Sequence, residues 1–114
     1  MKDDTLYLIH ILEGIGRIEQ YTAEGKGAFL RDTKTQDAVL RNLQTLSEST
    51  QRLSAALKAG HPEIDWVRVG GFRNVLVHDY LGINFVRVWE IIQNGLPQLK
   101  AAIEKILRDF GERP

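Results

Sequence analysis

The chain has no cysteine, no long apolar run and no net charge. Without cysteine, disulfides, thiolate nucleophiles and cysteine-ligated zinc sites are excluded. No apolar run approaches the roughly 20 residues of a membrane-spanning helix. The first residues, Met1–Asp4, lack the basic region and apolar stretch of a signal peptide. We therefore expect a cytoplasmic protein without a membrane partner.

The absence of net charge also limits how the chain could bind nucleic acid. Fifteen basic residues balance fifteen acidic ones, and no basic tail stands out. Nucleic-acid binding would need a local patch, or a cleft assembled by two chains. With 114 residues, 43% of them hydrophobic and 26% charged, the chain has the size and composition of one folded domain spanning residues 1–114.

Helical periodicity dominates the chain. No segment alternates strictly between apolar and polar residues, so no strand is expected. Apolar residues at three- and four-residue steps are typical of helices with one buried face. The predicted helices run from Thr5 to about Ala23, from the Asp32–Thr35 region to about Lys58, from Trp66 to about Val77 or His78, from Asn84 to about Ile92, and from Leu96 to Phe110. The pattern predicts an all-α, up-and-down bundle of four to five helices.

Caps and glycines refine this prediction. Asp65 and Asn84 are suited to cap the helices that follow them. Gly14 and Gly16 weaken the first helix, a cost usually tolerated where another backbone packs close. Gly70-Gly71 interrupts the third helix and suggests a close contact with another helix or another chain. The first helix is apolar enough to bury two sides, one of them against its own core.

An unusual set of polar residues lies on the mostly apolar third helix. Arg73, Asn74, His78 and Tyr80 fall within eight residues, and such groups need partners if they are buried. In a continuous α-helix, Asn74 and His78 share a face, whereas Arg73 and His78 diverge by about 140°. The last two could converge on one ligand if the helix ends at His78, or if two copies of the segment meet across a two-fold axis.

These residue types suit metal-free cleavage of RNA. A neutral imidazole can accept a proton from a ribose 2′-hydroxyl and later return one, while a guanidinium is a permanent donor to phosphate oxygens. The three histidines lack metal-ligand spacing. Structural roles compete with this interpretation: Arg73 could pair with Glu48 or Asp79, and Tyr80 could be a core aromatic. Asn74 could either orient catalytic groups or satisfy a buried backbone group.

The motif and its surroundings resemble the HepT family of toxins, in the HEPN superfamily of helical domains. The family pattern of Arg, a spacer, His, any residue and Tyr is matched by Arg73–Tyr80. The resemblance covers most of the chain. It also includes Asp37–Val39, Glu48, His61–Trp66, Trp89–Ile92 and Leu96-Pro97.

The resemblance implies the toxin of a toxin–antitoxin pair, a homodimeric endoribonuclease that needs no metal or cofactor. Arg73 and His78 of both chains would be catalytic in a shared cleft, with Asn74 in support. The expected partner is a minimal nucleotidyltransferase antitoxin, which adenylylates Tyr80. Asn84 stands where aspartate is expected in many relatives. An alternative, suggested by the neutral charge and the apolar first helix, is a non-catalytic helical partner of such a nucleotidyltransferase.

Overall fold

A computed structural model describes residues 2–76 and 82–111 of the chain. Apart from turns and a single β-bridge residue at Gly82, these residues are helical, and the predicted all-α fold is confirmed for them. No described helix is long and apolar enough to cross a membrane. The helices are α1 (Lys2–Tyr21), α2 (Lys26–Arg31), α3 (Thr33–Arg52), α4 (Ala55–Gly60), α5 (Trp66–Gly70), the 3₁₀ helix η1 (Gly71–Leu76), α6 (Phe85–Glu90), the π-helical turn η2 (Ile91–Gly95) and α7 (Leu96–Asp109).

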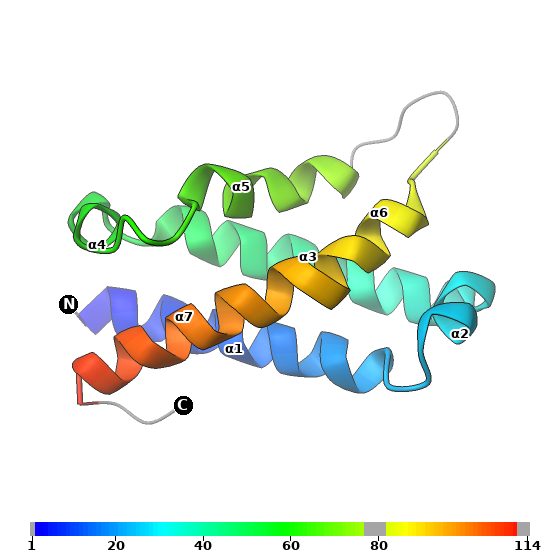
Figure 1. Ribbon diagram of the computed structural model, residues 1–114, viewed down its shortest axis with the longest axis horizontal. Helices are drawn as coiled ribbons and strands as arrows, with labels where there is room; N and C mark the ends of the chain where they lie inside the picture. Colours follow the sequence, from blue (N-terminus) through cyan, green and yellow to red (C-terminus); the bar gives the residue numbers. More distant parts are fainter. Residues whose placement is uncertain (1, 77–81, 112–114) are drawn as a thin grey trace.

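The core lies where α1, α3 and α7 pack together (Figure 1). The apolar stripes expected from the sequence are buried, because each places a side chain on the inner face at every helical turn. Burying a leucine or isoleucine side chain stabilises the fold by roughly 1.5–3 kcal/mol. The fully enclosed side chains of these three helices include Leu8, Ile11, Ile15, Ile18, Val39, Leu43, Leu46, Ile103, Ile106 and Leu107.

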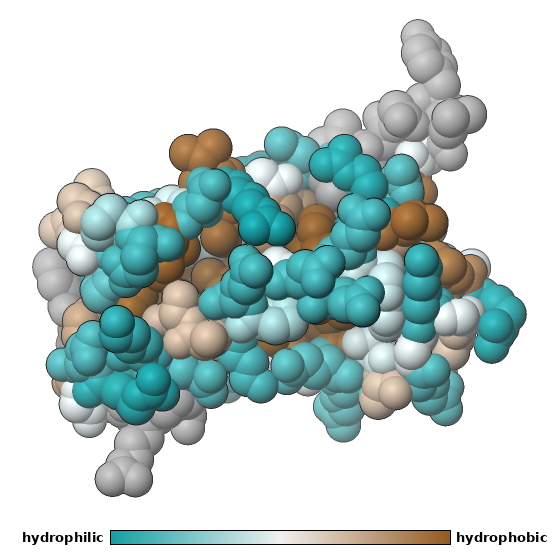
Figure 2. Space-filling model, viewed as in Figure 1, coloured by the Kyte–Doolittle hydropathy of each residue, from teal (hydrophilic) through white to brown (hydrophobic). Residues whose placement is uncertain are grey.

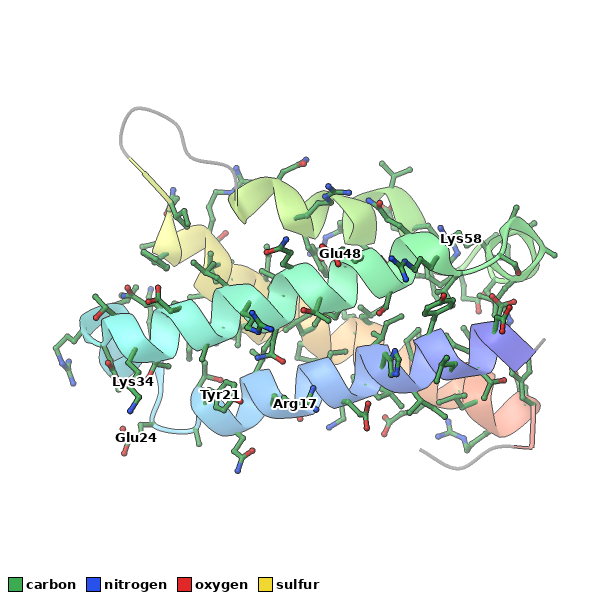
Figure 3. All side chains as sticks on the ribbon, turned by 180° about the vertical axis from the view of Figure 1, so that it is seen from behind. Arg17, Tyr21, Glu24, Lys34, Glu48 and Lys58 are labelled. Carbon is green, nitrogen blue, oxygen red and sulfur yellow. The ribbon has the colours of Figure 1, made fainter. Side chains whose placement is uncertain are left out.

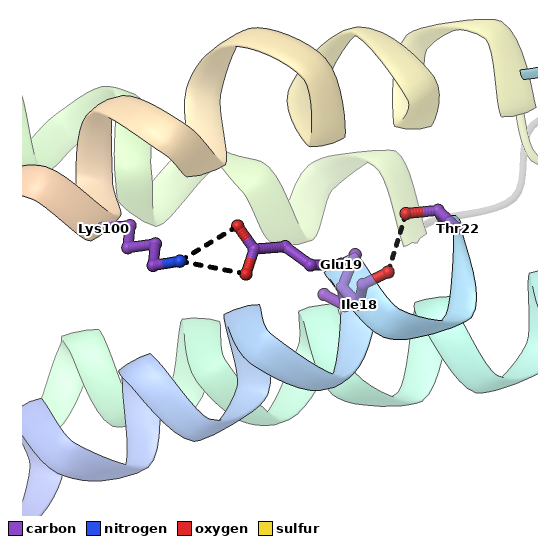
Figure 4. Close-up of polar contacts among 4 residues, drawn as sticks. All are labelled: Ile18, Glu19, Thr22 and Lys100. Carbon is purple, nitrogen blue, oxygen red and sulfur yellow. Dashed lines mark hydrogen bonds and ion pairs between the residues drawn. The ribbon is translucent and has the colours of Figure 1, made fainter. Parts of the chain in front are cut away.

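The helices α1 and α7 are joined by polar contacts on the surface (Figure 4). Lys100 Nζ donates to both carboxylate oxygens of Glu19, at 3.1 and 3.3 Å. Beyond them, the Thr22 hydroxyl donates to the Ile18 carbonyl at 2.7 Å, where α1 ends. Both members of the ion pair are substantially exposed, so the pair adds little to stability. The apolar packing beneath it holds the two helices together.

The predicted second helix is wrong at its C-terminal end, where α3 stops and α4 begins. The Asp4 carboxylate, buried on α1, accepts hydrogen bonds from the Ser54 amide at 2.8 Å and the Ser54 hydroxyl at 2.6 Å. The Ser54 hydroxyl in turn accepts from the Leu57 amide and caps α4. A charged acceptor 50 residues away thus favours a helix break at Ser54. The helical periodicity of the sequence around Ser54 could not predict this contact.

The short helix α2 was also missed by the periodicity. Its Phe29 ring is buried, and the Phe29 carbonyl accepts a hydrogen bond from the buried Gln36 side chain at 3.0 Å. Asp32 separates α2 from α3 and, of the candidates Asp32, Thr33 and Thr35, is the residue that caps α3, by accepting from the Lys34 amide. The Thr35 hydroxyl, which donates to Asp32 at 2.7 Å, lowers the pKa of the Asp32 carboxyl below its ordinary value.

The third helix differs most from the prediction of an α-helix reaching His78. Asp65 caps it as expected, accepting from the Arg68 amide at 3.0 Å. The α-helix ends at Gly70, however, and residues 71–76 form a 3₁₀ helix. Two successive glycines have the weakest preference for the α-helix apart from proline, which makes this the natural place for the change. Residues 77–81, including His78 and Tyr80, lie outside the described residues.

The close contact expected at Gly70-Gly71 is not made within the described part of the chain. A methyl group added at Gly70 would meet no described atom within 4 Å, and one at Gly71 would reach the Asn74 side-chain amide at 3.8 Å. The contact with a second chain stays a prediction. The close approach expected in the first helix is confirmed at Gly14, where such a carbon would lie 3.2 Å from Leu46 Cβ, whereas Gly16 has open space.

The tightest approach at any described glycine is at Gly95. An added Cβ there would lie 2.8 Å from Cζ of the buried Phe72 ring. Gly95 closes the π-helical turn that joins α6 to α7, so the chain remains helical from Phe85 to Asp109 instead of restarting after Asn94. Pro97 lies in the first turn of α7, directly after this π-helical turn.

The N-terminus of α6 is capped as predicted. The Asn84 side-chain oxygen accepts from the amides of Val86 at 3.1 Å and Arg87 at 3.2 Å. Two of the unsatisfied amide groups at the start of this helix therefore have a partner. Asparagine performs here the capping role that an aspartate would also perform.

We expect Gly95→Ala to destabilise the fold by about 1–3 kcal/mol, because the methyl group would displace the Phe72 ring from a packed core. Gly16→Ala is the matched control: it adds the same atoms where no described neighbour lies, and should stabilise α1 by up to about 1 kcal/mol. Urea unfolding followed by circular dichroism measures both. Equal stability of Gly95→Ala and wild type would show that the ring does not depend on this glycine.

Candidate functional site

The described part of the predicted site lies on η1. Arg73 and Asn74 are adjacent in this 3₁₀ helix, and both side chains are exposed. His78, Asp79 and Tyr80 fall outside the described residues, so their geometry relative to Arg73 stays a prediction. The structure therefore shows the positions of Arg73 and Asn74, and the two side chains have different surroundings.

The 3₁₀ geometry changes which residues of this segment share a face. With about three residues per turn, side chains three apart overlap and neighbours point about 120° apart. The four-residue spacing assumed for an α-helix does not hold from Gly71 to Leu76. The side chain of Arg73 lies on the side of η1 that faces α3, and that of Asn74 lies on the side that faces α6.

On the first side, Arg73 is held by α3. Its Nη1 donates to the side-chain oxygen of Gln51 at 2.9 Å. Glu48, the carboxylate expected to pair with an arginine here, instead accepts from Gln44 at 3.3 Å, one turn earlier on α3. Figure 3 shows Glu48 on the edge of α3 beside the strip formed by α5 and η1. The alternative in which Arg73 pairs with Glu48 is therefore wrong, and a neutral amide is the partner that the structure shows; the alternative partner Asp79 lies outside the described residues.

The neutral partner has a chemical consequence. A carboxylate beside Arg73 would offset its charge, whereas the Gln51 oxygen fixes one N–H group and carries no charge, and no carboxylate of residues 2–76 and 82–111 forms an ion pair with Arg73. The remaining N–H groups can face an anionic ligand. Sequence reasoning missed Gln51 because it lies 22 residues before Arg73. Its place on the polar face of α3 was the only available signal.

On the second side, Asn74 lines an open hollow between η1 and α6. This hollow has a volume of about 410 Å³, and its wall also includes Arg68, Arg87, Glu90 and Asn94. Neither Arg68 nor Arg87 was singled out by the sequence, because they lie on separate helices 19 positions apart. Only the fold brings them to one groove.

The segment before the site, His61–Trp66, has a structural role. The His61 carbonyl accepts from the Trp66 indole at 3.1 Å, and the His61 ring contacts the Glu63 carboxylate at 3.1 Å. A hydrogen bond from its own backbone amide and this contact with His61 lower the pKa of Glu63. Together with the Asp65 cap, these contacts fix the start of α5 and hence the position of η1.

The acidic side chains of the described residues are scattered and form no cluster. Residues 2–76 and 82–111 contain no group of three or more histidine, aspartate or glutamate side chains placed to hold a metal ion. Among the described acidic residues, Glu48 lies on α3 and is bonded to Gln44, whereas Glu90 lines the hollow beside Asn74.

Comparison with known proteins identifies the family. The sequence profile of the ribonuclease HepT-like family matches residues 11–106. A protein of Thermococcus cleftensis, provisionally named ribonuclease HepT, is 37% identical over 101 residues, covering 88% of this chain and 92% of the relative. A provisionally named RNase of Methanocaldococcus jannaschii is 34% identical over 110 residues, covering 96% and 91%. Another, from Caldanaerobacter subterraneus, is 30% identical over 112 residues, covering 95% and 97%.

No solved structure matches the chain. The profile match spans most of the sequence, including the segment that carries Arg73, and the relatives are aligned nearly end to end. The chain belongs to the HepT-like ribonuclease family. At the level of the family, this supports ribonuclease activity.

Proposed function

We propose that the protein is the toxin of a toxin–antitoxin pair and acts as a metal-independent endoribonuclease. The observation that carries this proposal is the exposed Arg73 guanidinium, anchored by a neutral amide at the start of the Arg73–Tyr80 motif. A permanent charge that is held in place, with no counter-charge among the described residues, is suited to a phosphodiester. The family match supplies the class of reaction.

In the proposed reaction, His78 removes the proton from the ribose 2′-hydroxyl. The 2′-oxygen then forms a bond to phosphorus, and the bond from phosphorus to the 5′-oxygen breaks. A protonated histidine returns a proton to that leaving oxygen, so acid and base balance. Arg73 stabilises the charge that develops on the phosphoryl oxygens, and Asn74 supports the site.

The complete site would be assembled by two chains. We propose an up-and-down helical bundle spanning residues 1–114 that pairs as a homodimer in the cytoplasm, with Arg73 and His78 of both copies facing one cleft. The zero net charge of the chain motivates this arrangement, since a shared cleft doubles the local positive charge. The proposed cleavage reaction needs no cofactor.

The antitoxin in this proposal is a minimal nucleotidyltransferase that transfers adenylate from ATP to Tyr80. The added phosphate would carry negative charge two residues from His78, and it would repel an RNA backbone while its bulk obstructs the cleft. Tyr80 is thus the switch and not part of the cleavage chemistry.

A second candidate function is a non-catalytic helical partner of the same nucleotidyltransferase. Exposed apolar side chains on α1, Leu6 and Tyr21, favour it, because unpaired apolar surface of this kind is common in protein interfaces. Expression that is toxic in wild type and harmless in His78→Ala would favour the enzyme. Harmless wild-type expression with tight partner binding would favour the binding module.

We expect His78→Ala to lower the rate of RNA cleavage by roughly 10²–10⁴-fold, through loss of the acid and base. Arg73→Ala should lower it by roughly 10²–10³-fold, through loss of a donor to developing charge. Cleavage of a fluorescent RNA, in buffer with and without EDTA, measures both, and circular dichroism verifies the fold. Unchanged rates in either variant, or wild-type activity that EDTA abolishes, would refute the mechanism.

Gln51→Ala should reduce kcat by roughly tenfold, because the variant lacks one hydrogen bond that orients the Arg73 guanidinium. Gln51→Glu retains an acceptor and should keep Arg73 in place while partly offsetting its charge, giving an intermediate rate. Gln44→Ala, on the same exposed face of α3, is the control. If Gln51→Ala and Gln44→Ala have the same kcat, Gln51 does not position the arginine.

Co-expression with the proposed nucleotidyltransferase should add one or more adenylate masses to the chain. We expect that mass to be absent from Tyr80→Phe, which lacks the acceptor hydroxyl, and from wild type expressed alone. Intact-protein mass spectrometry measures it. Added adenylate that persists in Tyr80→Phe would assign the modification to another residue.

A further inference from the structure

A groove lies beside Asn74, lined by residues of α5 and η1 and by residues of α6 and η2. Figure 1 shows α5 and α6 as separate segments on the same side of α3. Its volume, about 410 Å³, lies within the range of roughly 300–1,000 Å³ that is usual for ligand sites. The partly buried Ile91 and the buried Phe72 form its apolar floor. Its polar side chains are Arg68, Asn74, Arg87, Glu90 and Asn94.

The groove carries a local excess of positive charge. Arg87 is exposed and makes no side-chain hydrogen bond or ion pair with any described residue. Arg68 is also exposed, and its contact with the Gln98 oxygen is long, at 3.5 Å. Glu90 opposes them with one negative charge. Two guanidinium groups against one carboxylate leave a net positive groove in a chain whose formal charge is zero.

The other side chains suit a nucleotide. Asn74 and Asn94 each bring an amide, which both donates and accepts hydrogen bonds and so matches the edge of a base. Beyond Arg68 lies a second hollow of about 200 Å³ between α5 and α7, whose wall carries the carboxylates of Glu63 and Asp65. Figure 2 shows apolar surface between the hydrophilic side chains on this face. The positive part of this surface therefore ends at Arg68.

We propose that this groove binds the stretch of the RNA strand next to the cleaved phosphodiester. Arg68 and Arg87 contact the phosphates, and the amides of Asn74 and Asn94 contact a base. The inference rests on the proposed ribonuclease function and extends it. Arg73 is held on the α3 side of η1 and the adjacent Asn74 lines the groove on the α6 side, so a strand that runs from a phosphate at Arg73 into the groove has to cross η1.

Removing a positive charge from the groove should weaken RNA binding, and removing its negative charge should strengthen it. Arg68→Gln and Arg87→Gln should each weaken RNA binding by roughly three- to tenfold. Each should also lower the slope of log Kd against log salt concentration by about 0.7, because each removes one cation that neutralises a phosphate. Glu90→Gln should tighten binding by a few-fold. Arg108→Gln, at the far end of α7 from the groove (Figure 1), removes the same charge and should change affinity little.

The measurement is fluorescence anisotropy of a labelled single-stranded RNA, titrated at several salt concentrations with full-length protein carrying His78→Ala to prevent cleavage. Circular dichroism and size-exclusion chromatography verify fold and assembly of each variant. Weakened binding in both groove arginine variants, together with tighter binding in Glu90→Gln, supports the proposal.

Two outcomes would refute RNA binding in this groove without refuting the proposed ribonuclease function. In the first, RNA binds and the Arg68→Gln and Arg87→Gln proteins match Arg108→Gln. In the second, adenosine monophosphate binds to the parent but not to Arg87→Gln while RNA affinity is unchanged, which makes the groove a mononucleotide site. If the His78→Ala parent does not bind RNA and the wild type does not cleave it, the groove proposal falls together with the proposed function.

Discussion

The contact between the Phe72 ring and the Gly95 backbone joins the two halves of the candidate site. Phe72 belongs to η1, beside Arg73, and Gly95 closes the π-helical turn after Asn94. Because the ring would lie 2.8 Å from a Cβ at this position, only glycine lets η1 approach so closely. The polar groove beside Asn74 exists because these two segments are held at this distance, with side chains of α6 and η2 opposite those of α5 and η1.

The two exposed polar residues of the 3₁₀ helix η1 lie on different sides of it. Arg73 turns toward α3 and is fixed by Gln51, while Asn74 turns toward the groove. π-helical turns such as η2 are frequent at functional sites. Here the turn faces the 3₁₀ segment, so both irregular parts of the fold meet at one place.

The charge of the chain is neutral in total and uneven in distribution. Several surface carboxylates have polar partners, as Glu19 has Lys100, Glu48 has Gln44 and Glu63 has His61. Arg73, by contrast, is bonded to a neutral amide, and Arg87 has no partner among the described residues. A neutral chain can therefore present positive charge where an RNA strand would lie. The affinity expected from such a small number of phosphate contacts is modest and depends on salt, which agrees with a site completed by a second chain in the proposed dimer.

Much of the fold was determined by local sequence. The apolar stripes of α1, α3 and α7, and the caps at Asp32, Asp65 and Asn84, depend on residues within a turn or two of one another, so periodicity and capping rules predicted them. The motif from Arg73 to Tyr80 and its family could likewise be read from the chain, although His78 and Tyr80 lie outside the described residues. Only the tertiary structure decided the helix break that Asp4 stabilises at Ser54, the support of Arg73 by Gln51, and the groove that unites Arg68 with Arg87. Each of these features joins residues that are distant in the chain. A local sequence pattern does not show which distant residues will be in contact after folding.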